Sequence, residues 1–153
     1  MKPGAFTRMY VHIVFAVRFR EGILSKETRI KVFEYVTGIL RNLGHKPLIV
    51  GGYKDHMHIL IGLNPSVSVS DTVHAIKRSS SIFINENKLV NGHFSWQEGY
   101  GSFTCGHQDI NRLYKYIENQ EEHHSAKSFK SEFISIIEEN ELEYSPDFLF
   151  DFH

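Results

Sequence analysis

LIVGGYKDHMHILIGL, residues 48–63, is the stretch that decides the fold, because it predicts two strands and the turn between them. Leu48–Val50 and Met57–Leu63 are short apolar runs, and Gly51–Asp55 has the glycine content of a hairpin connection. We expect the two strands to pair antiparallel. The second strand also carries His56 and His58.

One strand and one helix are predicted before this hairpin, and one helix and one strand are predicted after it. The run Met9–Val17 alternates with the two-residue period of a strand, and Tyr100–Cys105 is predicted as a further strand between glycines. Helices are expected at Lys26–Leu43, after a capping Ser25, and at Ser68–Asn87. The resulting order, β-α-β-β-α-β, is typical of the ferredoxin-like α+β fold, an antiparallel sheet with helices packed on it. That fold serves many functions and does not identify one.

Two more helices are predicted towards the C-terminus, at Asp109–His123 and Ala126–Leu142. In the first, Tyr116 and Gln120 are four residues apart and share a face. Tyr116 lies off the apolar stripe, so packing explains it less well than it explains Tyr114, although a tyrosine at the edge of a core remains an alternative. The stripe that we expect to face the core consists of Ile110, Leu113, Tyr114 and Ile117.

Length and composition favour a single cytoplasmic domain spanning residues 1–153. The length suits one domain with a packed core, and 41% hydrophobic residues exclude a disordered chain. The single cysteine, Cys105, forms no internal disulfide and excludes CxxC zinc or redox sites. The early apolar stretch is too short and too polar for a membrane span or a signal peptide, so no membrane partner is expected.

Charge is distributed unevenly along the chain. The net charge is −1, but the first 130 residues hold all 17 basic residues and 11 of the 18 acidic ones, a net charge of +6. The remaining tail, about residues 131–153, contains seven acidic residues and no Lys or Arg. Such asymmetry favours a nucleic-acid partner, and a solvated acidic helix is the alternative reading of the tail.

His56 and His58 form half of a potential metal site. Because strand side chains alternate between faces, the two imidazoles project from the same side while Met57 points into the core. A His-x-His pair in a strand is also common as a packed or surface pair, so a third ligand is needed to make the site specific.

Four motifs together resemble the single-tyrosine HUH transposases, the TnpA enzymes of the IS200/IS605 insertion sequences, to which the REP-associated tyrosine transposases are related. The motifs are DHMHIL at residues 55–60, the run 70–80 with Lys77 before the serine cluster, WQEGYGSF at 96–103 and YIENQEEHH at 116–124. The resemblance extends from the first strand to about Phe129, and the acidic tail lies outside it.

This resemblance implies a metal-dependent enzyme that cuts and rejoins single-stranded DNA. It assigns a divalent ion to His56, His58 and Gln120, and the nucleophilic attack to Tyr116. The expected product is a 5′-phosphotyrosine and a free 3′-OH, which allows the step to be reversed at another site. Mg²⁺ or Mn²⁺ is the expected ion, although two imidazoles make the site softer than Mg²⁺ usually prefers.

The resemblance also implies DNA hairpins as the substrate and a homodimer whose active sites are shared between subunits. We expect phosphate contacts from Lys54, Lys77 and Arg78, and base stacking from Trp96 or Tyr100. For Trp96 an ordinary place in the core is the alternative, and for Lys77 and Arg78 a solvated helix face. His123 and His124 belong to the fourth motif, but adjacent helix residues point about 100° apart, so we do not expect both in one site with Gln120.

Two other functions stay open at this point: a non-catalytic ferredoxin-like nucleic-acid-binding module, and a domesticated nickase that cuts host repeats without moving an element. A histidine-triad hydrolase is disfavoured because its third histidine falls at Leu60. A two-histidine phosphoesterase needs a second His-x-Thr/Ser motif, which the sequence lacks.

Overall fold

A four-stranded antiparallel sheet forms the centre of the computed structural model, which describes residues 4–18, 23–124 and 127–145. The strands are β1 (Tyr10–Ala16), β2 (Lys46–Gly52), β3 (His56–Gly62) and β4 (Gly101–Cys105), in the spatial order β2-β3-β1-β4. The predicted hairpin is confirmed, since β2 and β3 pair antiparallel and only Tyr53–Asp55 separate them. The α+β ferredoxin-like order of elements is confirmed as well.

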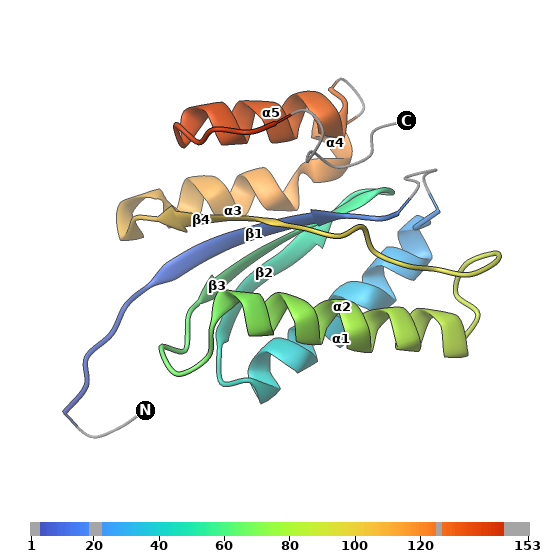
Figure 1. Cartoon of the computed structure of the whole chain (residues 1–153), viewed down its shortest axis with the longest axis horizontal. Helices are drawn as coiled ribbons and strands as arrows, with labels where there is room; N and C mark the ends of the chain where they lie inside the picture. The colour runs from blue at the N-terminus through green and yellow to red at the C-terminus, as the bar shows by residue number, and fades with distance from the viewer. Residues whose placement is uncertain (1–3, 19–22, 125–126, 146–153) are drawn as a thin grey trace.

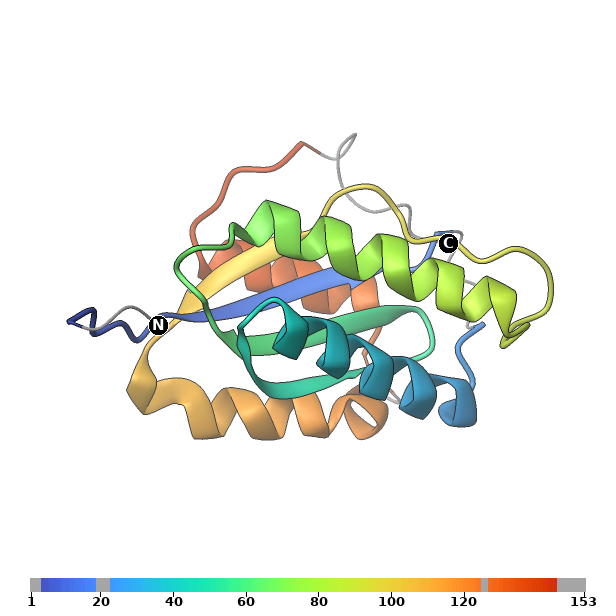
Figure 2. The same ribbon diagram turned by 90° about the horizontal axis from the view of Figure 1, so that it is seen from below.

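Helices cover both faces of this sheet. Helices α1 (Lys26–Asn42) and α2 (Val69–Glu86) lie across one face, as Figure 2 shows from below. On the other side lie α3 (Ile110–Glu118), α4 (Gln120–His124) and α5 (Phe129–Glu139), above the sheet in Figure 1. None of the helices among the described residues is long and apolar enough to cross a membrane.

Strand alternation separates an apolar face from a polar one. Directly paired residues of antiparallel strands point to the same side, and the register pairs Val14 with His58 and Ala16 with His56. Their neighbours Phe15 and Met57, which are also paired, therefore point to the opposite side. That side packs on α1 and α2 and forms the main core, whose fully buried members include Ile13, Phe15, Val36, Leu40, Met57, Ile59 and Ile76.

The single helix expected at 109–123 is divided in two. A short 3₁₀ turn at His107–Asp109 leads into α3, and the chain breaks at Asn119 before α4. The expected apolar stripe is also wrong in part, because Ile117 is buried but Tyr114 is 38% exposed. Since α3 lies along β2 rather than over the centre of the sheet, only a narrow strip of its surface is covered.

Helix α5 begins later than predicted and is capped by Ser128, whose hydroxyl accepts from the Ser131 amide. The expected start at Ala126 lies outside the described residues, as does the tail from residue 146. Three buried apolar side chains, Phe129, Phe133 and Ile137, dock α5 on the sheet.

Two glycines allow the helices of the polar face to approach the strands closely. A Cβ on Gly51 of β2 would lie 2.9 Å from Ile117 Cγ2 and 3.0 Å from the Ile117 carbonyl oxygen. A Cβ on Gly101 of β4 would lie 2.9 Å from the ring of Phe133. The absence of side chains at these positions therefore sets how near α3 and α5 come to the sheet.

Candidate metal and nucleophile site

Strand β3 places His56 and His58 side by side on the polar face of the sheet, both fully buried. Each histidine has a partner at Nδ1 that orients its ring. Asp55 Oδ1 lies 2.7 Å from His56 Nδ1, and His12 Nε2 of β1 lies 2.8 Å from His58 Nδ1. Such outer partners fix the tautomer and the direction of a ligating imidazole.

Tyr116, near the end of α3, and Gln120, the first residue of α4, both lie next to the histidine pair. Gln120 Oε1 lies 2.8 Å from His56 Nε2, and the ring of Tyr116 meets that of His58 edge-on with 5.8 Å between centroids. Tyr116 is partly buried and Gln120 is 1% exposed. One chain thus brings together the four side chains to which the family resemblance assigns the metal and the nucleophile, without a second subunit.

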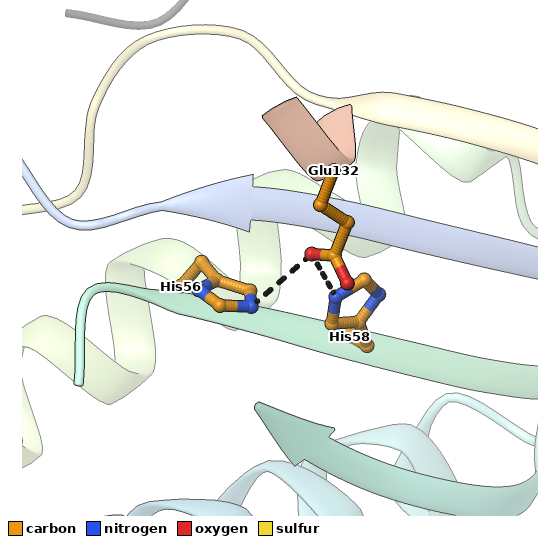
Figure 3. Close-up of side chains that lie close together, drawn as sticks. All are labelled: His56, His58 and Glu132. Atoms are coloured by element: carbon orange, nitrogen blue, oxygen red, sulfur yellow. Dashed lines mark hydrogen bonds and ion pairs between the residues drawn. The ribbon is translucent and has the colours of Figure 1, made fainter. Parts of the chain in front are cut away.

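A fifth side chain, Glu132 of α5, occupies the centre of this cluster (Figure 3). Its Oε1 lies 3.0 Å from His58 Nε2 and 3.4 Å from His56 Nε2. Its Oε2 accepts from the Tyr116 hydroxyl and, at 2.9 Å, from the amide of Gln120. Glu132 was not predicted as a site residue, because in the sequence it belongs to an acidic tail outside the family resemblance.

The electrostatics of the cluster follow from burial around one charge. Burial alone would raise the pKa of Glu132, but contacts and charges from His124, His58 and His56 outweigh it and hold that pKa well below its usual range. Burial lowers the pKa of His58, against the opposing effect of Glu132. Burial and the adjacent Glu132 carboxylate raise the pKa of Tyr116, so its phenol is kept protonated.

His123 and His124 both reach this cluster, which corrects the expectation that they could not. His123 Nε2 lies 3.4 Å from Glu132 Oε2, and His124 Nε2 lies 3.1 Å from Glu132 Oε1. Adjacent residues leave a helix in different directions, but both of these side chains still reach a carboxylate that another helix, α5, supplies. Among the described residues, these two Nε2 atoms are buried without a hydrogen bond.

The donor set suits a divalent ion. His56, His58 and Glu132 offer ligand atoms within 4.8 Å of one another, as do His123, His124 and Glu132. Imidazole nitrogens with carboxylate and carboxamide oxygens are typical ligands of Mn²⁺ and of later transition metals. The residues therefore fit a divalent metal ion, and among the two expected ions they suit Mn²⁺ better than Mg²⁺.

Trp96 lies in the core and does not present its ring to a ligand. It is 8% exposed, and it meets the rings of Phe15 and Phe94 edge-on at 4.8 and 4.9 Å. Its indole N–H donates to Ser80 Oγ at 2.9 Å. The structure thus gives Trp96 the alternative role considered from the sequence, and we exclude it from the DNA-contacting set.

The Lys77 side chain is hydrogen-bonded to the loop before β4. Its ammonium donates to the carbonyls of Gln97 and Gly99 at 2.7 and 2.6 Å, and burial lowers its pKa to about 8. It also lies over the ring of Phe15. These contacts make Lys77 a brace between α2 and the loop, and we exclude it from the DNA-contacting set too.

The other three candidate DNA contacts are exposed. Lys54 lies in the β2–β3 turn next to Asp55, at the His56 end of the site. Tyr100, directly before β4, is 39% exposed. Arg78 is exposed on α2 and therefore lies on the opposite side of the sheet from the histidines (Figure 1).

A cavity of ≈ 490 Å³ adjoins Tyr116 between β4, α3 and α5. Its lining includes basic residues, Arg112 and Lys127, and acidic residues, Asp109 and Glu139. Tyr116 and Glu132 also line it, so the cavity borders the buried cluster.

Comparison with known proteins identifies the family of this chain. The family model described as "Transposase IS200 like" matches residues 5–120. The chain belongs to the IS200-like transposase family. The match covers the sheet, the histidine pair, Tyr116 and Gln120, and it ends before α5 and Glu132.

This transposase is also similar to individual relatives. ISDra2 transposase TnpA from Deinococcus radiodurans is 24% identical over 123 residues, which cover 76% of this chain and 87% of that protein. A crystal structure described as that of a transposase from D. radiodurans R1 has a TM-score of 0.62 at 21% identity, covering 78% of this chain and 96% of the other. A REP-associated tyrosine transposase bound to a REP hairpin has a TM-score of 0.60 at 14% identity, with 81% and 74% covered. At these identities the two structures show the shared fold.

Proposed function

We propose that this transposase cuts and rejoins single-stranded DNA at hairpin-bearing element ends through a covalent bond to Tyr116. One observation carries the proposal: a single chain brings the Tyr116 hydroxyl, the His56–His58 pair and Gln120 around one buried point. A non-catalytic binding module has no need of a tyrosine hydroxyl next to a set of metal donors.

Tyr116 is the nucleophile in this proposal. Its Oη attacks the scissile phosphorus, the bond from Oη to phosphorus forms, and the bond from phosphorus to the 3′ oxygen breaks. The products are a 5′-phosphotyrosine and a strand that ends in a 3′-OH. Because Glu132 Oε2 accepts the hydrogen bond of the phenol, it lies within reach of the proton that Oη loses. The leaving 3′ oxygen takes up a proton in exchange.

His56, His58 and Gln120 are the proposed ligands of Mg²⁺ or Mn²⁺. When bound, such an ion neutralises charge that develops on the phosphoryl oxygens. Asp55 and His12 keep the two imidazoles directed at the site. Burial of both histidines keeps competing water away from them.

Single-stranded DNA with hairpins is the proposed partner. The relative bound to a REP hairpin supports this class of substrate. We assign Lys54, which is exposed beside the site, to a phosphate contact, and Tyr100, with its half-exposed ring, to stacking. Arg78 remains a proposed contact for DNA that wraps to the far side of the sheet.

The experiment that tests the proposal combines Tyr116→Phe with a hairpin-bearing oligonucleotide from the ends of the element. We expect wild-type protein with Mn²⁺ to form a covalent protein–DNA adduct, visible as a shifted band on a denaturing gel. Tyr116→Phe should form none and still bind the oligonucleotide, and EDTA should abolish the adduct. Tyr114→Phe, which changes an exposed tyrosine on the same helix, is the matched control. An adduct in Tyr116→Phe would overturn the assignment.

The expected homodimer with shared active sites can be tested separately. In the described conformation Tyr116 serves the histidines of its own chain. We therefore expect a mixture of Tyr116→Phe and His56→Ala chains to stay inactive. If the mixture recovers cleavage, Tyr116 acts on the histidines of the other subunit.

A further inference from the structure

Three imidazole nitrogens lie around one carboxylate oxygen of Glu132. Its Oε1 has imidazole nitrogens of His58, His124 and His56 at 3.0, 3.1 and 3.4 Å. The side chain is 1% exposed, so these contacts are shielded from water.

His56 and His124 each use Nδ1 away from Glu132 and turn Nε2 towards it. His56 Nδ1 donates to Asp55 Oδ1 at 2.7 Å, and His124 Nδ1 donates to the Lys127 carbonyl at 2.6 Å. In the neutral form of each ring, Nε2 then has only a lone pair to offer. Such a nitrogen and the negatively charged oxygen repel each other unless a proton or a metal cation lies between them.

The spacing of the donor atoms is compatible with that of ligands around one ion, and also with hydrogen bonds. Atoms bound to a common ion at about 2.1 Å lie about 3.0–3.4 Å apart, which are the edges of an octahedron and a tetrahedron of that size. Glu132 Oε1 lies 3.0 Å from His58 Nε2 and 3.4 Å from His56 Nε2. Gln120 Oε1 lies 2.8 Å from His56 Nε2.

Packing holds Glu132 in this position. The ring of Phe129, three residues earlier on α5, stacks on the His56 imidazole with 4.2 Å between centroids. Phe133 is buried against Gly101, where a side chain would collide with it. The helix that carries Glu132 is therefore docked directly on a metal-donor histidine.

We propose that Glu132 is a ligand of the divalent ion and completes the His56, His58 and Gln120 set with a carboxylate from α5. This inference rests on the proposed function, which provides the ion. The carboxylate adds a hard, negatively charged oxygen to two softer imidazoles and so favours Mn²⁺ and Mg²⁺. Through Oε2 the same group holds the Tyr116 hydroxyl, so it links the ion to the nucleophile. Helix α5, which lies beyond the matched family region, thereby becomes part of the site.

The test measures Mn²⁺ binding to the purified full chain by calorimetry, without DNA. Glu132→Gln keeps the shape of the side chain and removes its charge. We expect it to weaken Mn²⁺ binding by about tenfold or more, while the exposed Glu138→Gln on the same helix binds like wild type. His56→Ala should lose binding as well. Circular dichroism in EDTA confirms that each variant is folded.

The outcomes separate this inference from the proposed function. If His56→Ala loses Mn²⁺ and Glu132→Gln binds it with wild-type affinity, Glu132 is not a ligand and the metal site of the proposed function stands. If wild type and His56→Ala are equally unable to bind Mn²⁺, both are overturned.

A second measurement uses unaltered protein, so it does not depend on how a variant folds. Infrared difference spectra of wild type with and without Mn²⁺ should show a shifted carboxylate stretch, because ligation changes the two C–O bonds of Glu132. A difference spectrum without a carboxylate band would overturn the proposal.

Discussion

The two faces of the sheet differ in what their side chains do, although the same strands supply both. On the α1–α2 side, Phe15, Met57 and Ile59 are fully buried in an apolar core. On the α3–α5 side, His56 and His58 are equally buried but surround the charged Glu132. Burying apolar surface stabilises the chain, whereas burying charge and imidazole costs stability unless the groups are paired. The apolar face therefore stabilises the fold, and this stability offsets the cost of burying the polar groups on the other face.

A core substitution on the apolar side should have the largest effect on the free energy of unfolding. Ile59→Ala removes a fully buried side chain between β3 and the α1–α2 layer, and we expect the free energy of unfolding to fall by about 2–5 kcal/mol. Adduct formation per folded molecule should be unchanged, since Ile59 points away from His58. Urea denaturation measures the loss, and Ile59→Val should show about 0.5–1.5 kcal/mol. A loss below that of Ile59→Val would contradict the role given to this face.

Gly51→Ala should disturb the close packing of α3 on β2, with the next largest effect. The added Cβ would lie 2.9 Å from Ile117 Cγ2 and 3.0 Å from its carbonyl, so α3 must move. We expect a loss of about 1–3 kcal/mol in the free energy of unfolding, with a larger relative loss of adduct because Tyr116 adjoins Ile117. Gly38→Ala, in open space on α1, is the control and should stabilise by about 0.5–1 kcal/mol. Wild-type adduct yield in Gly51→Ala would refute the positioning argument.

Ser80→Ala tests whether Trp96 belongs to the apolar core or to a DNA-binding surface. The variant leaves the buried indole N–H without the acceptor that it has at 2.9 Å. We expect the free energy of unfolding to fall by about 1–3 kcal/mol while DNA affinity stays the same. Ser81→Ala, which removes a hydroxyl from the adjacent position, should have a smaller effect. If Ser80→Ala weakens DNA binding without lowering stability, Trp96 belongs to the DNA surface after all.

The smallest expected effect is a pH dependence that arises on the apolar side, at His45. This side chain is 4% exposed, lies 2.8 Å from Thr72 Oγ1, and accepts from the Asn64 amide at 2.9 Å. Burial lowers its pKa below 6.5, so the unfolded chain binds a proton more readily than the folded one. Its stabilising contribution is thus present above pH 6.5 and is lost as the pH falls below that value. His45→Gln should reduce the slope of unfolding free energy against pH in this range, and an unchanged slope would contradict the prediction.

The elements that could be predicted from sequence are those with strong local signals. The strand period at Met9–Val17 and the Ser25 cap gave β1 and the start of α1 close to their observed bounds. The break at Asn119 could not be predicted, because the residues on both sides of it have the periodicity of one continuous helix. The exposure of Tyr114 was missed for a related reason: periodicity shows which residues share a helix face, but not how much of that face another element covers.

Part of the site could be found from the sequence and part could not. His12 had a usable signal, since it stands in a strand beside the histidine strand and on the face that alternation assigns to Val14 and Ala16. Glu132 had none, because it lies 74 residues from His58 in an acidic segment that also suits a solvated helix. The brace formed by Lys77 was equally hidden, since its acceptors are backbone carbonyls of a loop.

By itself the amino-acid order determined the sheet, its hairpin, the pairing of His56 with His58 on one face, and the shared face of Tyr116 and Gln120. These depend on the two-residue and 3.6-residue periods of the backbone, which are local properties of the chain. Only the tertiary structure decided that Glu132 enters the site, that His123 and His124 join it, and that Trp96 belongs to the core. Those outcomes depend on how closely separate helices pack on the sheet, and close packing is a property of the whole molecule.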